Sequence, residues 1–225
     1  MGTRNLTCAV IDGEYKIAQY GQWDGHPDGQ GKTALQFLRE KMKRKVFEEK
    51  LRAVEEITDD EYGECWTDCG ADPKSDFVTM DVSKRFSEKY PYLHRDCGAE
   101  ILAIVQDSPK GIKLRHEVGF ARESLFCEWC YVADFDRDTF EVYSGFNTTS
   151  PLPKSARFYY PGQEATKPSA DGTKYYPVRL LRKYNLRKLP TVKKFLADMK
   201  KIEDRREEQY RIETNKKEVE ERLED

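Results

Sequence analysis

The first 22 residues constrain the fold most, because two alternating segments flank a turn there. Apolar side chains occupy every second position from Leu6 to Val10, which is typical of a β-strand with two different faces. Asp12-Gly13 follows, and this dipeptide is a strong signal for a two-residue hairpin turn. The segment 14–22 has the composition of the partner strand. The chain is therefore predicted to begin with a β-hairpin, which must find a place in a sheet.

Helical periodicity follows the hairpin. Over residues 32–57 apolar side chains recur at spacings of three and four, with charged residues between them. The segment 58–61, Thr-Asp-Asp-Glu, is a capping-box pattern that predicts the start of another helix. Shorter helices are predicted over residues 81–90, ended by Pro91, and over residues 96–106.

The second half of the chain predicts a second hairpin. Residues 123–135 are rich in aromatic side chains, and residues 139–146 return with strand-like composition after a turn at 136–138. Pro, Gly, Ser and Thr dominate residues 147–174, which predicts a long loop of the kind that often serves as a functional flap. Residues 175–181 are predicted to form one more strand.

Together these elements predict one α+β domain, residues 1–199, in which antiparallel β-hairpins pack against helices. Residues 200–225 hold 8 Lys/Arg and 10 Asp/Glu, so they are predicted to form a charged, solvated helical extension. Such a helix could mediate homo-oligomerisation or bind a protein partner.

Composition narrows the possible partners. The net charge is only -2, which gives no global attraction to nucleic acid or to an anionic membrane. No segment approaches the roughly 18 apolar residues of a membrane span, and the N-terminus has no apolar signal-peptide core. We therefore expect a cytoplasmic protein with reduced cysteines, no cofactor, and a small molecule or peptide as the ligand.

Two motifs partly match known sites, a phosphate-binding loop and a zinc site. Gly31-Lys32-Thr33 matches the end of a phosphate-binding P-loop, but the first glycine of that motif would fall at His26. Cys127 and Cys130 have a zinc-ligand spacing, but they lie in a predicted strand, where an offset of three places them on opposite faces. We therefore expect neither nucleotide hydrolysis nor a metal site, and we interpret these cysteines as structural.

Residues 20–33, YGQWDGHPDGQGKT, form the candidate site and are called the QWDG loop below. Its glycines permit close approach of backbone to a ligand, and its polar side chains supply donors and acceptors. The candidate ligand-binding residues are Gln22, Trp23, Gly25, His26, Gly29, Gln30 and Gly31, and the candidate catalytic residues are Thr3, Arg4 and Asp24.

Each candidate has an expected role. Arg4 would hold an anionic or carbonyl group, because the start of the first strand meets the end of the second. Asp24 would orient the ligand or accept a proton, and Trp23 would stack on it. The alternative is a plain turn in which Asp24 caps the next helix and Trp23 covers the core.

The N-terminal block resembles a family of mostly hypothetical proteins from bacteria, phages and filamentous fungi. Members open with Met-Gly-Thr-Arg and continue, after a hairpin, with Gln-Trp-Asp-Gly-Tyr-Pro-x-Gly-Gln-Gly. This chain matches both motifs except that His26 replaces the tyrosine. The segment 128–136, EWCYVADFD, is also similar to a strand of that family. The resemblance implies no settled activity.

The outline is also similar to the N-terminal nucleophile hydrolases, in which the first residue of a strand attacks an amide. Thr3 and Arg4 on the first strand, with Asp24 at the end of the second, have that arrangement. Removal of Met1 alone would expose Gly2, so the mechanism requires a cut before Thr3. The function expected is thus a hydrolase-like or small-ligand site, and the alternatives are a phage- or defence-related binder and a protein-interaction module.

Overall fold

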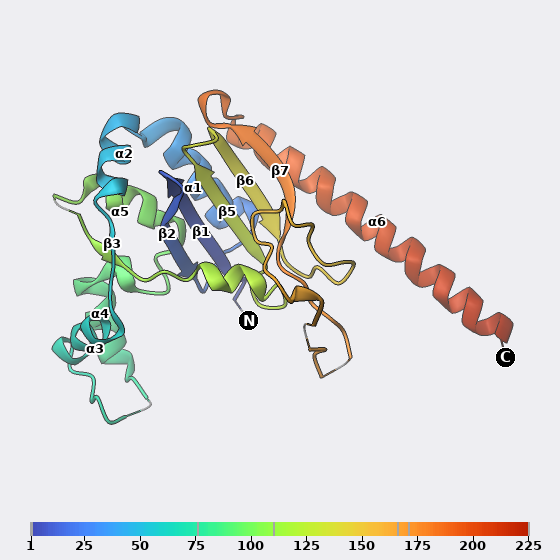
Figure 1. The fold of residues 1–225 in the computed structure, drawn as a ribbon, viewed down its shortest axis with the longest axis horizontal. Coiled ribbons are helices and arrows are strands. Elements are labelled where there is room, and N and C mark those ends of the chain that lie inside the picture. The colour runs from blue at the N-terminus through green and yellow to red at the C-terminus, as the bar shows by residue number, and fades with distance from the viewer. Residues whose placement is uncertain (1, 76, 110, 166, 171, 225) are drawn as a thin grey trace. The chain divides into compact units, whose positions relative to one another are not determined.

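The computed structural model describes residues 2–75, 77–109, 111–165, 167–170 and 172–224 (Figure 1). The chain forms two compact units, Met1–Leu189 and Pro190–Asp225. The second unit contains a single long helix, α6 (Val192–Glu224), which the charged composition predicts. Residues 199 and 200, where sequence analysis divides the chain, both belong to this helix.

The first unit is built on a five-stranded sheet with the order β2-β1-β5-β6-β7. The strands are β1 (Asn5–Ile11), β2 (Glu14–Gly21), β5 (Trp129–Asp134), β6 (Thr139–Ser144) and β7 (Arg179–Asn185). Strands β1 and β2 form one antiparallel hairpin, and β5 and β6 form the other. The two hairpins are joined through β1 and β5, which run parallel. The predicted α+β class is confirmed.

The predicted N-terminal hairpin is confirmed in detail. Asp12 and Gly13 both have positive φ angles, 54° and 79°, as a two-residue turn with right-handed strand twist requires. All seven residues of β1 are buried, and β2 and β5 pair with this strand on its two sides. In this hairpin β1 is therefore an interior strand, and β2 is an edge strand of the sheet.

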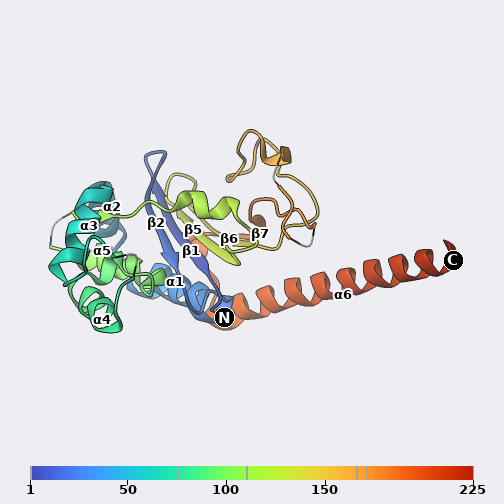
Figure 2. The ribbon, with the colours of Figure 1, turned by 90° about the horizontal axis from the view of Figure 1, so that it is seen from below.

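One face of the sheet is covered by irregular chain. Leu6, Cys8 and Val10 lie on this face, as their alternation predicts, in a buried cluster with Phe158 and Val178. The cover consists of the 3-10 helix Val118–Arg122 and the long loop between β6 and β7, which contains the short 3-10 helix Gln163–Ala165. Figure 2 shows the loop and α1 on opposite sides of the sheet.

The other face is covered by the second half of the QWDG loop and the chain that follows it. A π-helical turn, Pro27–Gly31, leads into α1 (Lys32–Gln36), a second π-helical turn, Phe37–Lys41, and α2 (Arg44–Arg52). The predicted single helix over 32–57 is therefore wrong: the chain is extended at Met42, and α2 ends at Arg52.

A long-range contact explains the break between the two helical segments. The backbone N–H of Lys43 donates to Oε1 of Gln106 at 2.7 Å, outside any helical ladder. Phe47 is completely buried, with its ring 5.1 Å from that of Phe37 and 5.5 Å from that of Phe135. Tertiary packing has here overridden a continuous helical pattern.

Two helices form a lobe at one end of the first unit (Figure 1). Helix α3 (Asp59–Asp68) starts with the predicted capping box, in which Thr58 and Glu61 bond reciprocally. Helix α4 (Met80–Lys89) ends before Pro91, as predicted. The rings of Trp66 and Phe86 stack at 3.7 Å between the two helices. These helices are called the α3–α4 lobe below.

The lobe joins the rest of the first unit through short elements. They are the 3-10 helices Pro91–Leu93 and Gly98–Glu100, helix α5 (Ile101–Asp107), and the two-residue strands β3 (Glu55–Glu56) and β4 (Lys113–Leu114), which pair in parallel. The 3-10 helix Leu186–Lys188 follows β7. Within the described ranges, no helix combines the length and apolar character that a membrane crossing needs.

The second hairpin differs from its prediction at both ends. The N–H groups of Phe126 and Cys127 both donate to the carbonyl of Glu123, so residues 123–127 form a turn. Strand β5 therefore begins only at Trp129. Cys127 therefore precedes the strand. It lies with Cys130 and Cys8 in one buried cluster, so the predicted opposite faces are wrong. The last strand covers 179–185 and not the predicted 175–181.

Candidate functional site

The QWDG loop folds back onto the start of β1. The backbone N–H of Gly25 donates to the carbonyl of Thr3 at 2.9 Å. The buried side chain of Asn5 donates to the carbonyls of Gly21 and Trp23, at 3.3 and 3.2 Å. These contacts fix the loop at the edge where sequence analysis places it.

The loop glycines make close contacts with the protein itself. A Cβ atom on Gly31 would lie 2.7 Å from the ring of Tyr131, and one on Gly29 would lie 2.2 Å from the carbonyl of Asp24. The hydroxyl of Tyr131 donates to the carbonyl of Gly25 at 2.7 Å. The absence of side chains at these glycines therefore lets the loop pack on the sheet.

Both candidate glutamines are bonded within the protein. Oε1 of Gln30 accepts from the N–H of Ala99 at 2.7 Å, and its Nε2 donates to the carbonyl of Trp23 at 3.4 Å. Oε1 of Gln22 accepts from the hydroxyl of Tyr20 at 2.5 Å. Gln30 thus links the loop to the chain before α5, and Gln22 orients Tyr20.

The backbone places Thr3 beside Gly25, but among the described residues no hydrogen bond or ion pair joins the side chains of the candidate catalytic residues. The guanidinium of Arg4 lies over the ring of Phe126, 4.7 Å from its centroid, and Asp24 is exposed with a φ of 56°. Across the described residues no ion pair joins Arg4 to Asp24. The Asp24 side chain does not cap the turn Pro27–Gly31 or helix α1 either.

The two remaining candidates are accessible. The Trp23 side chain is 45% exposed, so it does not cover the core, and its ring leaves no room for a side chain at Gly2. His26 is exposed, and its ring centroid is 5.8 Å from that of Trp129. These two rings can meet a ligand or partner from solvent.

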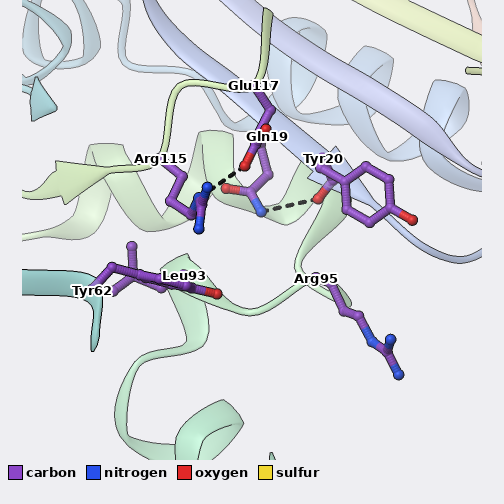
Figure 3. A pocket seen from close by; sticks show the side chains of 7 residues that line it. All are labelled: Gln19, Tyr20, Tyr62, Leu93, Arg95, Arg115 and Glu117. Atoms are coloured by element: carbon purple, nitrogen blue, oxygen red, sulfur yellow. Dashed lines mark hydrogen bonds and ion pairs between the residues drawn. The ribbon is translucent and has the colours of Figure 1, made fainter. Parts of the chain in front are cut away.

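A cavity of about 170 Å³ begins beside the QWDG loop, at the end of β2 (Figure 3). The lining residues are Gln19, Tyr20, Tyr62, Leu93, Arg95, Arg115 and Glu117. They come from β2, from the α3–α4 lobe and the segment after it, and from the segment that follows β4. The backbone N–H of Gln22 donates to the carbonyl of Arg95 at 2.9 Å, so the loop and the cavity share a wall.

The cavity wall is held in place by polar contacts. The Arg115 guanidinium lies over the face of Tyr62, 4.5 Å from its centroid, and its Nε lies 2.8 Å from the carboxylate of Glu117. The buried Gln19 side chain donates to the carbonyls of Tyr20 and His94, at 3.0 and 3.4 Å. A cation and an amide are therefore fixed side by side before any ligand arrives.

Two further cations influence the Tyr20 hydroxyl. Burial raises the pKa of Tyr20 above its ordinary value, and the positive charges of Arg4 and Arg95 act in the opposite direction. The net direction is upward, so the hydroxyl is protonated at neutral pH. Arg4, the residue that sequence analysis proposes as an anion binder, therefore lies electrostatically close to this end of β2.

Most of this cavity could not be predicted from the sequence. Gln19 lies in a predicted strand next to the predicted loop, but Tyr62, Arg95 and Arg115 come from segments distant in the sequence. No motif or spacing connects them, because only the folding of the α3–α4 lobe against β2 brings them together.

A buried ionic cluster fastens the long loop to the opposite end of the sheet. Arg157, whose side chain is 7% exposed, pairs with the Asp134 carboxylate and donates from Nε to Oε2 of Glu141 at 2.7 Å. The Tyr143 hydroxyl donates to the same oxygen at 2.5 Å, and Nζ of Lys183 lies 3.1 Å from the other. The charges of the carboxylates are neutralised by cations within the cluster itself. We therefore interpret the cluster as a structural clamp on the loop.

The clamp makes stability depend on pH. Burial alone would raise the pKa of Glu141, but the bonds from Arg157 and Tyr143 outweigh it and hold the pKa at about 2. Because the folded pKa lies below the ordinary value of 4.5, the stabilisation is fully present above that value and is lost as the pH falls towards 2.

Urea unfolding at pH 7, 4 and 3 tests this dependence. We expect the free energy of unfolding to fall more steeply below pH 4.5 in the wild type than in Glu141→Gln, which has no proton to bind at this position. Parallel curves for the two proteins would show that Glu141 does not have the depressed pKa.

Fold and cavity together define the class: an α+β protein with a mixed five-stranded sheet and a small polar cavity at the β2 edge. Comparison of the chain with protein-family models, with curated proteins and with solved structures finds no match. The resemblance of the N-terminal block to an MGTR–QWDG family therefore stays a prediction.

Proposed function

We propose that this protein binds a small ligand, without chemical turnover, in the cavity between β2 and the α3–α4 lobe. The observation that supports this best is the prearranged wall, in which Gln19 and Arg115 are held by contacts with other protein groups. A site whose polar groups are already positioned loses less conformational entropy when a ligand binds.

The cavity sets the size of what it can hold. Sites for drug-sized ligands usually enclose roughly 300–1,000 Å³. A volume of about 170 Å³ accommodates a small molecule, or one terminal group of a larger molecule. The exposed rings of Trp23 and His26 at the neighbouring loop could then contact the remainder.

Hydrolysis is supported less well by the geometry. A nucleophile and its base must lie within about 2.6–3.2 Å of each other, directly or through one water. In the part of the chain that the structure describes, no hydrogen bond or ion pair joins the side chains of Thr3, Arg4 and Asp24. N-terminal nucleophile chemistry stays a prediction. It requires that the measured intact mass of the purified protein lacks both Met1 and Gly2.

The binding proposal can be tested by thermal unfolding against a panel of anionic, neutral and cationic fragments. We expect at least one class to raise the melting temperature of the wild type. At a concentration of 100 times Kd, the expected stabilisation is about 2.7 kcal/mol. For a chain of this size that corresponds to a rise of roughly 5–10 °C.

A matched pair of variants locates the binding. Gln19→Leu removes the amide from the cavity wall, whereas Gln36→Leu makes the same change in α1, away from the cavity. We expect the ligand-induced shift to be lost in Gln19→Leu and kept in Gln36→Leu. Equal shifts in both variants, or no shift with any fragment in the wild type, would contradict the proposal.

A further inference from the structure

We infer that the group entering this cavity is an oxyanion, a carboxylate or a phosphate, and that Arg115 binds it. The inference rests on the proposed function, because it specifies what the same cavity holds. It adds a chemical class and one residue responsible for selectivity.

The charges of the lining favour an anion. Arg95 and Arg115 are cationic, and the only acid among the lining residues is Glu117. Glu117 is already engaged, at 2.8 Å from Nε of Arg115. Asp96 lies beyond the lining and is half exposed, 4.0 Å from Nε of Arg95, where solvent screens it. A cationic ligand would therefore meet a net positive wall.

Arg115 is placed to bind an oxyanion through two hydrogen bonds. A guanidinium has five N–H donors in a planar fork, and the contact with Glu117 is made at Nε. The face of Tyr62 fixes the plane of that fork from one side. Its terminal N–H groups can then pair with two oxygens of one carboxylate or phosphate, which is the strongest arrangement open to such a pair.

Arg95 would attract the anion from the mouth of the cavity. Its backbone carbonyl is held by Gln22, but its side chain is 62% exposed and extends away from Arg115 in Figure 3. We therefore assign it a long-range electrostatic role. Neutralising Arg95 should weaken binding less than neutralising Arg115, and the Arg95 contribution should fall as salt is added.

Titration calorimetry with the full-length chain tests the inference, using acetate, inorganic phosphate, acetamide and methylammonium at constant ionic strength. Acetate and acetamide have similar size and shape, so the pair isolates charge. We expect saturable binding of acetate or of phosphate, and the comparison of these two distinguishes the carboxylate source from the phosphate source. Acetamide and methylammonium should bind at least tenfold more weakly.

Three variants assign the binding to Arg115. Arg115→Gln should weaken anion binding more than tenfold, and Arg115→Lys should weaken it less, because it keeps the charge but loses the fork. Arg39→Gln is the control, since Arg39 is an exposed arginine whose ion-pair partner, among the residues that the structure describes, is its neighbour Glu40. If Arg115→Gln does not fold, Arg115→Lys and the acetate–acetamide comparison still decide the question.

The outcomes separate the two proposals. Preferential binding of acetamide or methylammonium, lost in Gln19→Leu, would overturn the oxyanion inference and leave ligand binding intact. Anion binding that is equal in Arg115→Gln and Arg39→Gln would also overturn it. Absence of binding by every probe and every fragment would contradict the proposed function itself.

Discussion

Replacement of Arg157 by methionine should lower the free energy of unfolding by about 3–5 kcal/mol. Methionine keeps much of the apolar stem but removes the guanidinium that neutralises Asp134 and Glu141. Both carboxylates are almost completely buried, with side chains 2% and 0% exposed. Lys183 still pairs with Glu141, but Asp134 is left with the exposed Arg137 at 3.8 Å. A poorly compensated buried charge is much more costly than a missing surface ion pair, so the loss should be large.

Urea denaturation provides the measurement, and Arg137→Met provides the control. Arg137 also approaches Asp134, at 3.8 Å, but its side chain is 63% exposed, so its loss should cost less than about 1 kcal/mol. Adding Glu141→Gln and Asp134→Asn to Arg157→Met should recover part of the stability. Equal losses in Arg157→Met and Arg137→Met would show that the clamp contributes no more than a surface pair.

The second large effect is expected at Gly31. A methyl group there would lie 2.7 Å from the ring of Tyr131, well inside van der Waals contact. The ring cannot shift freely, because it is fully buried and its hydroxyl bonds to the carbonyl of Gly25. We expect Gly31→Ala to lower the free energy of unfolding by about 3 kcal/mol through overpacking.

Gly63→Ala is the matched control. Gly63 lies exposed in α3, and a Cβ there would contact nothing within 4 Å. Alanine should therefore raise stability, by about 0.5–1 kcal/mol, because it restricts the unfolded chain. If Gly31→Ala were as stable as the wild type, the loop glycine would not be required for packing, and its proposed role in ligand approach would regain support.

The loop shows why a correct local prediction does not by itself establish a residue's role. Gln30 and the loop glycines do stand at the rim of the first hairpin, as predicted. Their polar and steric properties are used by Ala99 and Tyr131, which lie about 70 and 100 residues further along the chain. Residues suited to holding a ligand are equally suited to holding another part of the protein, and the sequence does not show which is present.

The helix predicted over 32–57 failed for a related reason. Its apolar spacing is helical throughout, and periodicity contains no information about the contacts of Lys43 with Gln106 or of Phe47 with two other rings. The capping box at Thr58 was predictable because both partners lie three residues apart. A predicted element was thus confirmed where the interacting groups lie close together in the sequence, and it was wrong where they lie far apart.

The sequence alone determined the elements whose causes are local: the Asp12-Gly13 turn, the alternation in β1, the start of α3, and the charged helix α6. Only the tertiary structure decided that β1 pairs in parallel with β5, that Arg157 closes the long loop, and that Arg115 meets Gln19 at one cavity. Turns and caps depend on dihedral angles and hydrogen bonds within a few residues. The sheet order, the clamp and the cavity depend on which distant apolar surfaces are buried together, and many pairings satisfy the same local pattern.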